Sequence, residues 1–157
     1  MPFIRQLSAL ALAALIPIAH PAGAASPFAT LNGNWSGGGV ALFEGGQSER
    51  LRCNARYTSA SSSRLDLDLR CASTSGTFHL SGRLTDRGGR VTGEWSEHSF
   101  GAEGTAVGRA SGDSIVLRLS GTVAGAMLVS TSGSRQSVSV STQGTALRNI
   151  RITLRRR

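Results

Sequence analysis

The positive charge of this 157-residue chain comes only from arginine, because its 17 basic residues include no lysine and face 9 acidic residues. This length suits one domain with a single hydrophobic core and leaves little room for a second. Aromatic residues make up only 5% of the chain, too few for the stacking surfaces that basic single-strand-binding barrels use, so nucleic acid is not an expected partner.

The N-terminal 24 residues have the pattern of a secretory signal peptide. Arg5 supplies the positive charge, residues 7–18 the apolar stretch and residues 22–24 the small side chains of a cleavage site. A membrane anchor needs roughly 20 apolar residues, which is more than this segment offers. We therefore expect a signal peptide at 1–24, a single domain at 25–157 without a transmembrane span, and a periplasmic or secreted location.

The stretch GNWSGGG at residues 33–39 raises the question of a phosphate-binding loop. Such a loop leads from a strand into a helix, often with a lysine, and neither a helical pattern nor a lysine follows here. Glycines inside a strand instead permit a bend or bulge at the corner of a barrel. We therefore expect residues 37–39 to lie within a strand and Trp35 to close one end of the fold.

Turn signals divide the rest of the chain into about ten strands. Between turns, apolar and polar residues alternate with the period of two that is typical of strands, as in residues 50–57 and 64–71, and no segment keeps helical spacing. The short links favour an antiparallel meander. The nine turn signals lie at 44–47, 59–63, 73–76, 86–89, 99–101, 111–113, 121–124, 132–134 and 143–144.

An all-β meander of this kind can close into an up-and-down barrel or fold into a β-sandwich. We favour the barrel, because closure removes both edge strands and sandwiches usually need long connections, but the sandwich stays an alternative. A membrane-spanning barrel would place charged side chains such as Arg50, Arg52 and Asp66 in lipid. We therefore expect a monomer that folds in water.

Cys53 and Cys71 are the only cysteines and follow the expected signal peptide, so export would allow them to form a disulfide. Pairing them sets a hairpin register in which Ala55 faces Leu69, Tyr57 faces Leu67 and Ser59 faces Leu65, with a loop at residues 60–64. All of these side chains would then share the buried face.

The motif Gly33-Asn34-Trp35 on the first strand, together with the meander, resembles the calycin group of lipocalins, fatty-acid-binding proteins and avidins. The resemblance implies a calycin-like barrel and, as in lipocalins, an arginine near the end of the barrel that packs on the tryptophan. Arg148 and Arg151 are the candidates for that role. Arg148 precedes Ile150 by two residues, so the alternation of a strand predicts that both side chains point inward.

Two further resemblances concern the whole pattern. An early tryptophan and a two-cysteine bridge are similar to small periplasmic inhibitors of bacterial metalloproteases, although their N-terminal inhibitory segment has no counterpart here. The segments ERLRC and LDLDLRCAS resemble a group of small exported proteins of alphaproteobacteria, and this resemblance implies no activity.

Enzymatic chemistry finds little support in the sequence. The strings nearest to a Gly-x-Ser-x-Gly elbow place the serine one position late. His79 is expected to face solvent, and His98 with Glu94 and Glu97 would need a further ligand to hold a metal. We therefore expect no enzyme, no metal site and no cofactor.

Three functions remain open. The first is a module that binds a small ligand, mainly apolar or with an anionic head, inside the barrel, where the inward small residues Ala55, Gly82 and Gly93 would leave room. The second is docking on anionic surface polymers, and the third is inhibition of a secreted protease. The ligand candidates are Trp35, Tyr57, Trp95 and Arg148, and the anion-docking candidates are Arg151, Arg155, Arg156 and Arg157.

Overall fold

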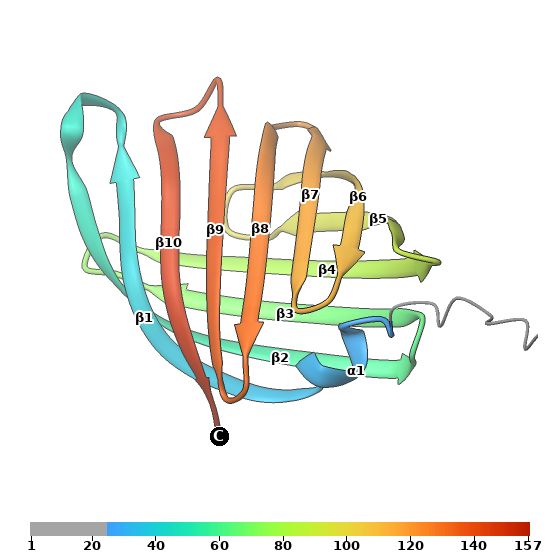
Figure 1. Ribbon diagram of the computed structural model, residues 1–157. Helices are drawn as coiled ribbons and strands as arrows, with labels where there is room; N and C mark the ends of the chain where they lie inside the picture. Colours follow the sequence, from blue (N-terminus) through green and yellow to red (C-terminus); the bar gives the residue numbers. More distant parts are fainter. Residues whose placement is uncertain (1–24) are drawn as a thin grey trace, which may run out of the picture.

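A computed structural model describes residues 25–157, so the predicted signal peptide at 1–24 lies outside the described residues. Within this range ten antiparallel strands form one closed barrel, in which each strand pairs with its neighbours in the chain and β1 pairs with β10 (Figure 1). The strands are β1 (Gly33–Phe43), β2 (Ser48–Ser61), β3 (Arg64–Ala72), β4 (Thr77–Arg87), β5 (Arg90–Glu97), β6 (Ala102–Ser111), β7 (Ser114–Gly121), β8 (Ala124–Ser132), β9 (Arg135–Gln143) and β10 (Leu147–Arg156).

The predicted all-β, up-and-down barrel is therefore confirmed, and the sandwich alternative is wrong. All nine predicted turns fall at or next to connections between consecutive strands. Two short helical segments had no signal in the residue pattern. They are α1 (Phe28–Leu31), which precedes the barrel, and the 3-10 turn η1 (Glu44–Gly46) between β1 and β2. Within residues 25–157, no helix is long and apolar enough to cross a membrane.

Strand β1 bends from one side of the barrel to the other (Figure 1). Its glycines make that bend possible, because a Cβ at Gly37 would lie 2.0 Å from the carbonyl oxygen of Thr153, and one at Gly39 would lie 1.9 Å from that of Arg151. Residues 33–42 nevertheless keep an unbroken pairing with β2. The predicted role of these glycines in a strand is confirmed, and the strand bends here without a bulge.

The barrel has one closed and one open end. At the closed end lie α1, the β2–β3, β4–β5, β6–β7 and β8–β9 turns and the C-terminus, and Phe28, Leu31 and Trp35 are almost fully buried there. The other five connections surround the opposite end, which we call the mouth. Alternation along each strand directs one set of side chains inward, as in β3, where Leu65, Leu67, Leu69 and Cys71 are buried.

The β2–β3 hairpin has the predicted register around the disulfide. Cys53 and Cys71 are bonded and directly opposite each other, with a Cα–Cα distance of 4.1 Å, and Ala55 and Tyr57 face Leu69 and Leu67. The predicted Ser59–Leu65 pair and the loop at residues 60–64 are wrong. The register shifts after Thr58, and both strands continue to a two-residue turn at residues 62–63.

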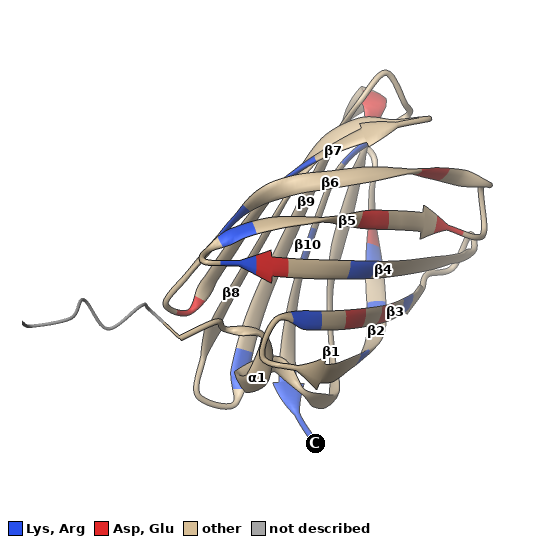
Figure 2. Ribbon diagram, turned by 90° about the vertical axis from the view of Figure 1, so that its right-hand side faces the viewer, with Lys and Arg blue, Asp and Glu red and all other residues tan. Residues whose placement is uncertain are grey.

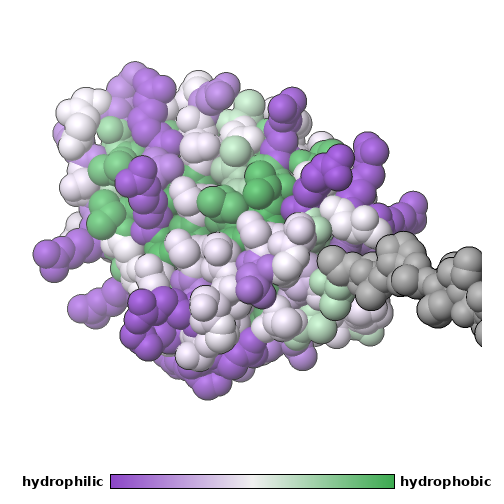
Figure 3. Space-filling view, in the orientation of Figure 1, coloured by the Kyte–Doolittle hydropathy of each residue, from purple (hydrophilic) through white to green (hydrophobic). Residues whose placement is uncertain are grey.

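The outer face differs between the two sides of the barrel. Around β2–β5 it carries charged residues of both signs, and basic segments lie side by side at the closed ends of β4, β5 and β6 (Figure 2). Around β7–β10 it is rich in serine, and Val116 and Leu128, which are paired across β7 and β8, are 53% and 43% exposed. Hydrophobic side chains lie across the middle of this second face, with hydrophilic ones around them (Figure 3).

Candidate functional site

The mouth of the barrel contains a cavity of about 540 Å³. Volumes of roughly 300–1,000 Å³ are typical of small-molecule sites. The cavity opens between the loops that connect β1–β2, β3–β4, β5–β6, β7–β8 and β9–β10. Residues of all ten strands and of four of these loops line it, and its apolar residues include Ala41, Phe43, Leu51, Phe78, Leu80, Phe100, Ala102, Leu119, Val123, Val140, Leu147 and Ile150.

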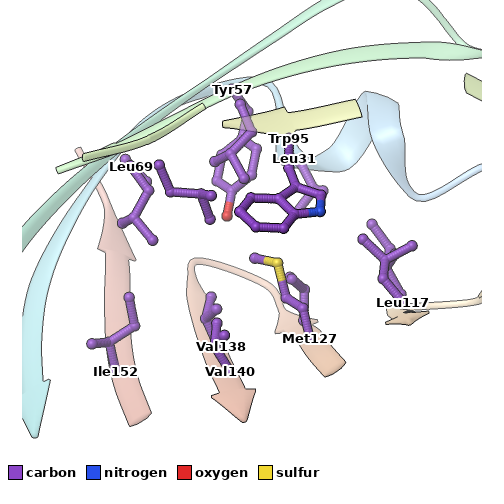
Figure 4. Packing of buried hydrophobic residues seen from close by; sticks show 14 of the residues in the cluster. Leu31, Tyr57, Leu69, Trp95, Leu117, Met127, Val138, Val140 and Ile152 are labelled. Carbon is purple, nitrogen blue, oxygen red and sulfur yellow. The ribbon is translucent and has the colours of Figure 1, made fainter. Parts of the chain in front are cut away.

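Trp95 on β5 forms the boundary between this cavity and the packed half of the barrel. It lines the mouth cavity and also a void of about 30 Å³ deeper in the barrel. Its indole lies above Met127 in the interior (Figure 4), and its Nε1 donates a hydrogen bond of 3.1 Å to the carbonyl oxygen of Thr105. Of the four predicted ligand residues, only Trp95 is placed where a ligand in the mouth cavity would meet it.

Glu49 on β2 brings a carboxylate to the cavity. It has the same parity as the buried Leu51, so its side chain is directed toward the interior at the mouth. The hydroxyl of Ser75, in the β3–β4 loop, lies 2.5 Å from Oε1 and 2.6 Å from Oε2. Hydrogen bonds from Ser73 and Ser75 hold the pKa of Glu49 below its usual value, which favours the ionised form.

Glu97 at the end of β5 supplies a second carboxylate to the lining, and it is 5% exposed. Its Oε1 accepts hydrogen bonds from the backbone N–H groups of His79 (2.8 Å) and Ser99 (3.1 Å), and its Oε2 accepts one from Phe100 (2.7 Å). All three partners are backbone donors, so both carboxylate oxygens are held by the main chain. Glu97 thus fixes the β5–β6 loop at the rim of the cavity.

Sequence reasoning did not identify either carboxylate as a site residue. The signal was present in the alternation, because Glu49 precedes Leu51 by two residues and Glu97 follows Trp95 by two. Glu97 was considered only as a metal ligand beside His98 and Glu94, and Glu49 was not considered.

Trp35 lies in the closed half, 1% exposed, and its Nε1 donates a hydrogen bond of 2.8 Å to the carbonyl oxygen of Leu31. The predicted arginine partner exists, but it is Arg156 and neither Arg148 nor Arg151. The guanidinium of Arg156 lies 4.4 Å from the centre of the indole ring and donates hydrogen bonds to the carbonyl oxygens of Thr30 and Asn32. Trp35 is therefore part of the closure of the barrel and does not line the mouth cavity.

The prediction that Arg148 points inward is wrong. The pairing of β10 with β1 shifts between Leu42 and Phe43, so the alternation that makes Ile150 buried does not extend to Arg148. Leu147 lines the cavity instead. The Arg148 side chain is 51% exposed and its Nη2 lies 2.5 Å from Oε1 of Glu44.

Tyr57 is also placed in the packed half, where it lines the small void and is 3% exposed (Figure 4). Its hydroxyl donates a hydrogen bond of 2.7 Å to Oε1 of Gln136. Burial raises the pKa of Tyr57 far above its usual value, and the bond to Gln136 opposes this shift. This hydroxyl is therefore neutral at physiological pH.

The small inward residues do not create the cavity. Among the described residues that line it, Ala55, Gly82 and Gly93 are absent. A Cβ at Gly93 would lie 2.1 Å from the carbonyl oxygen of Arg83, so this glycine permits close approach of two strands. The open space instead lies at the mouth, between the loops.

The predicted anion-docking residues lie on β10 and at the C-terminus, and they differ in how free their side chains are to contact an anion. Arg151 and Arg155 are exposed on the outer face, and Nε of Arg157 donates to the hydroxyl of Ser36 at 2.8 Å. Arg156 is held against Trp35 and the end of α1, as described above. Three of the four side chains therefore remain accessible to an anion.

His79 and His98 lie on the outside of the barrel, as predicted for His79. Their rings stack with centroids 4.5 Å apart, but Nε2 of His79 contacts Asp68 whereas Nε2 of His98 contacts Ser81, each at 2.8 Å. Burial alone would raise the pKa of Asp68, but hydrogen bonds from His79 and Arg70 hold it below its usual value. Serine and aspartate thus contact different imidazoles, which is not the arrangement of a catalytic triad.

Comparisons with known proteins place the fold. No family model matches the chain, and a search of curated proteins found no match. Among solved structures, Rv2717c from M. tuberculosis is 20% identical with a TM-score of 0.66, and the match covers 81% of this chain and 92% of that one.

Two other solved structures have the same architecture. The S-type phycobiliprotein lyase CPES from Guillardia theta is 13% identical with a TM-score of 0.55, covering 83% of this chain and 89% of that one. EF1p2_mFAP2b bound to DFHBI is 12% identical with a TM-score of 0.52, covering 85% and 98%. At these identities the likeness concerns the fold alone, which is a calycin-like barrel.

Proposed function

We propose that this protein is a binding module that holds a small, mainly apolar ligand in the mouth cavity. The observation that carries the proposal is the division of the barrel interior, in which one half is packed and the other contains a cavity of about 540 Å³ with an apolar lining. A cavity that is open at one end and apolar inside can bury most of a small ligand. The proposed role is binding, with no chemical step.

Two features support this function and its location. One barrel of similar fold was solved bound to DFHBI, and another is a phycobiliprotein lyase, so the architecture is compatible with a ligand. The Cys53–Cys71 disulfide fits an oxidising compartment, in line with the proposed export to the periplasm or medium.

The test uses Nile red, a neutral apolar dye whose fluorescence rises in apolar surroundings. We expect the unmodified protein to bind it, and Ala102→Phe to reduce binding by about tenfold, because this residue lines the cavity and a phenyl ring there occupies part of the space that the dye needs. The matched control is Val107→Phe on the outer face of the same strand, where the residue is 46% exposed. Equal binding by both variants would contradict the proposed site.

A ligand retained from the natural host gives a second measurement. A native mass spectrum of protein purified from that host should show a mass above that of the polypeptide, and Ala102→Phe should lose it. A bare polypeptide mass together with no Nile red binding would overturn the proposal.

A second candidate function, docking on an anionic surface polymer, is favoured by the arginines at the closed end. Arg90 lies directly opposite both Arg87 on β4 and Arg109 on β6, and Arg135 lies opposite Arg155. Like charges in such positions are destabilising. Within residues 25–157 none of these five arginines forms an ion pair, and a bound polyanion would remove their repulsion.

Retention on a heparin column tests this second function. The variant Arg87→Ser/Arg90→Ser/Arg109→Ser should elute at clearly lower salt than Arg50→Ser/Arg52→Ser/Arg118→Ser, which loses the same charge elsewhere on the outer face. Equal elution of the two triple variants would show that net charge, and not this cluster, accounts for retention.

A further inference from the structure

We propose that the mouth cavity selects ligands whose polar end is cationic, such as an amine on an apolar body, and that Glu49 is the residue that recognises it. This inference rests on the proposed binding function and adds the charge of the ligand to it.

The charge of the lining is opposite to that of the protein. The chain has a net charge of +8, yet the ionisable side chains that line the cavity within residues 25–157 are two glutamates, Glu49 and Glu97. No arginine or histidine of the described chain is among the lining residues. A protein with nearly twice as many basic as acidic residues thus presents only carboxylates to a ligand in its cavity.

The two carboxylates are not equally available. Glu97 is occupied by three backbone N–H groups that hold the β5–β6 loop. Glu49 is more exposed than Glu97 and is contacted by the hydroxyls of Ser73 and Ser75, whereas an ionised carboxylate has about four acceptor positions. Glu49 therefore keeps acceptor capacity at the rim, while the two serines fix the position of its carboxylate.

Neighbouring arginines do not neutralise Glu49. Arg148, the arginine of the β9–β10 side of the mouth, is turned outward and forms an ion pair with Glu44. Arg50, the next residue in β2, is exposed on the opposite face of the strand. The charge of Glu49 thus remains open to a ligand.

This arrangement disfavours an anionic ligand head. A carboxylate or phosphate in the cavity would lie near two negative charges and would lose hydration without gaining a cationic partner. A cationic head would instead pair with Glu49 while the apolar body lies against Trp95 and the apolar lining. With Arg148 turned outward, we propose a cationic head in place of the anionic head expected from the sequence.

The experiment compares decan-1-ol, decylamine and decanoate by isothermal titration calorimetry at neutral pH and low salt. The three probes share one alkyl chain and differ in the charge of the head. We expect decylamine to bind about tenfold more tightly than decanoate, with decan-1-ol between them, and the preference to shrink as salt is added.

Two variants test whether Glu49 accounts for the preference for a cationic head. Glu49→Gln should reduce the preference for decylamine over decanoate by about threefold to fivefold, because an ion pair at a partly exposed rim contributes modestly. Glu103→Gln is the control, since it removes one acidic charge from the outer face near the mouth. The preference is a ratio within one variant, so a general loss of affinity in Glu49→Gln does not affect it.

The outcomes separate the inference from the proposed function. Binding of decan-1-ol with equal affinities for decylamine and decanoate would keep the binding function and overturn the cationic selectivity. A decylamine preference that Glu49→Gln and Glu103→Gln reduce equally would overturn the role of Glu49. If none of the three probes binds, the proposed function itself fails.

Discussion

Arg156 joins three parts of the closed end through one side chain. It stacks on Trp35 of β1, bonds to the carbonyl oxygens of Thr30 and Asn32 and belongs to the last strand. Arg156→Ala should lower the free energy of unfolding by about 1 to 2 kcal/mol, because both the cation–π contact and the carbonyl partners are lost. Urea unfolding followed by tryptophan fluorescence measures it, and Arg155→Ala is the control. Equal effects of the two variants would show that the contact is not stabilising.

Tyr57 and Gln136 form a hydrogen-bonded polar pair in the packed half of the barrel. Nε2 of Gln136 is buried and has no hydrogen-bond partner among the described residues, so the bond from Tyr57 satisfies only the oxygen Oε1 of this amide. Tyr57→Phe should cost about 1 to 3 kcal/mol, since it leaves a buried acceptor unpaired as well.

The double variant Tyr57→Phe/Gln136→Leu should recover part of that loss, because both polar partners are then removed together. A thermal unfolding cycle of the two single variants and the double variant gives the coupling. Strict additivity of the single effects would contradict a stabilising bond between the two side chains.

Among the elements, the β2–β3 hairpin is cross-linked within the core. The two cysteines are 18 positions apart and nearly fully buried. Replacing both by alanine should lower the free energy of unfolding by about 3 kcal/mol, if the bond acts mainly by restricting the unfolded chain. Urea unfolding with and without a reducing agent measures this. Unchanged midpoints would contradict it, and the double variant should not respond to the reducing agent.

The strands and their order were predictable because alternation and turn residues are local signals. The inward face of β2 and β3 followed from the alternation, and the register at Cys53 followed from pairing the two cysteines. The alternation gave wrong pairs or orientations beyond two register shifts, one after Thr58 and one between Leu42 and Phe43. A register shift depends on the partner strand, which the local sequence does not specify. For this reason Arg148 was predicted to point inward. The cavity was expected beside Ala55, Gly82 and Gly93 for another reason, namely that small inward side chains would leave room.

Some features of the site depend on contacts that no local pattern encodes. Helix α1 is four residues long, too short for a periodic signal, and its position is fixed by burial of Phe28 and by Arg156 from the other end of the domain. The mouth cavity likewise is lined by residues of all ten strands and of four loops, which meet only in the closed barrel. Glu49 and Glu97 line the same cavity only because the closed barrel brings the mouth ends of β2 and β5 to it.

At the scale of the whole molecule, unpaired arginines dominate the electrostatics. Ion pairs between arginines and acidic residues within residues 25–157 involve Arg70, Arg83 and Arg148, whereas arginines face each other across β4, β5 and β6 at the closed end. Their repulsion acts over about 10 Å at an ionic strength of 0.1 M and falls as salt is added. The protein should therefore be more stable at moderate than at low concentrations of sodium chloride.

Arg90 is the central residue of this row, since it faces Arg87 on one side and Arg109 on the other. Arg90→Ser should raise the Tm at low salt by about 1 to 3 °C and reduce the gain in Tm on adding sodium chloride, because two like-charge contacts are removed. Arg70→Ser is the matched control, as it removes the same charge from a side chain that is paired with Asp68. Scanning calorimetry at several salt concentrations makes the comparison. A lower Tm for Arg90→Ser at low salt would show that this arginine stabilises the barrel, and the closed end would then need no bound anion to offset a repulsion.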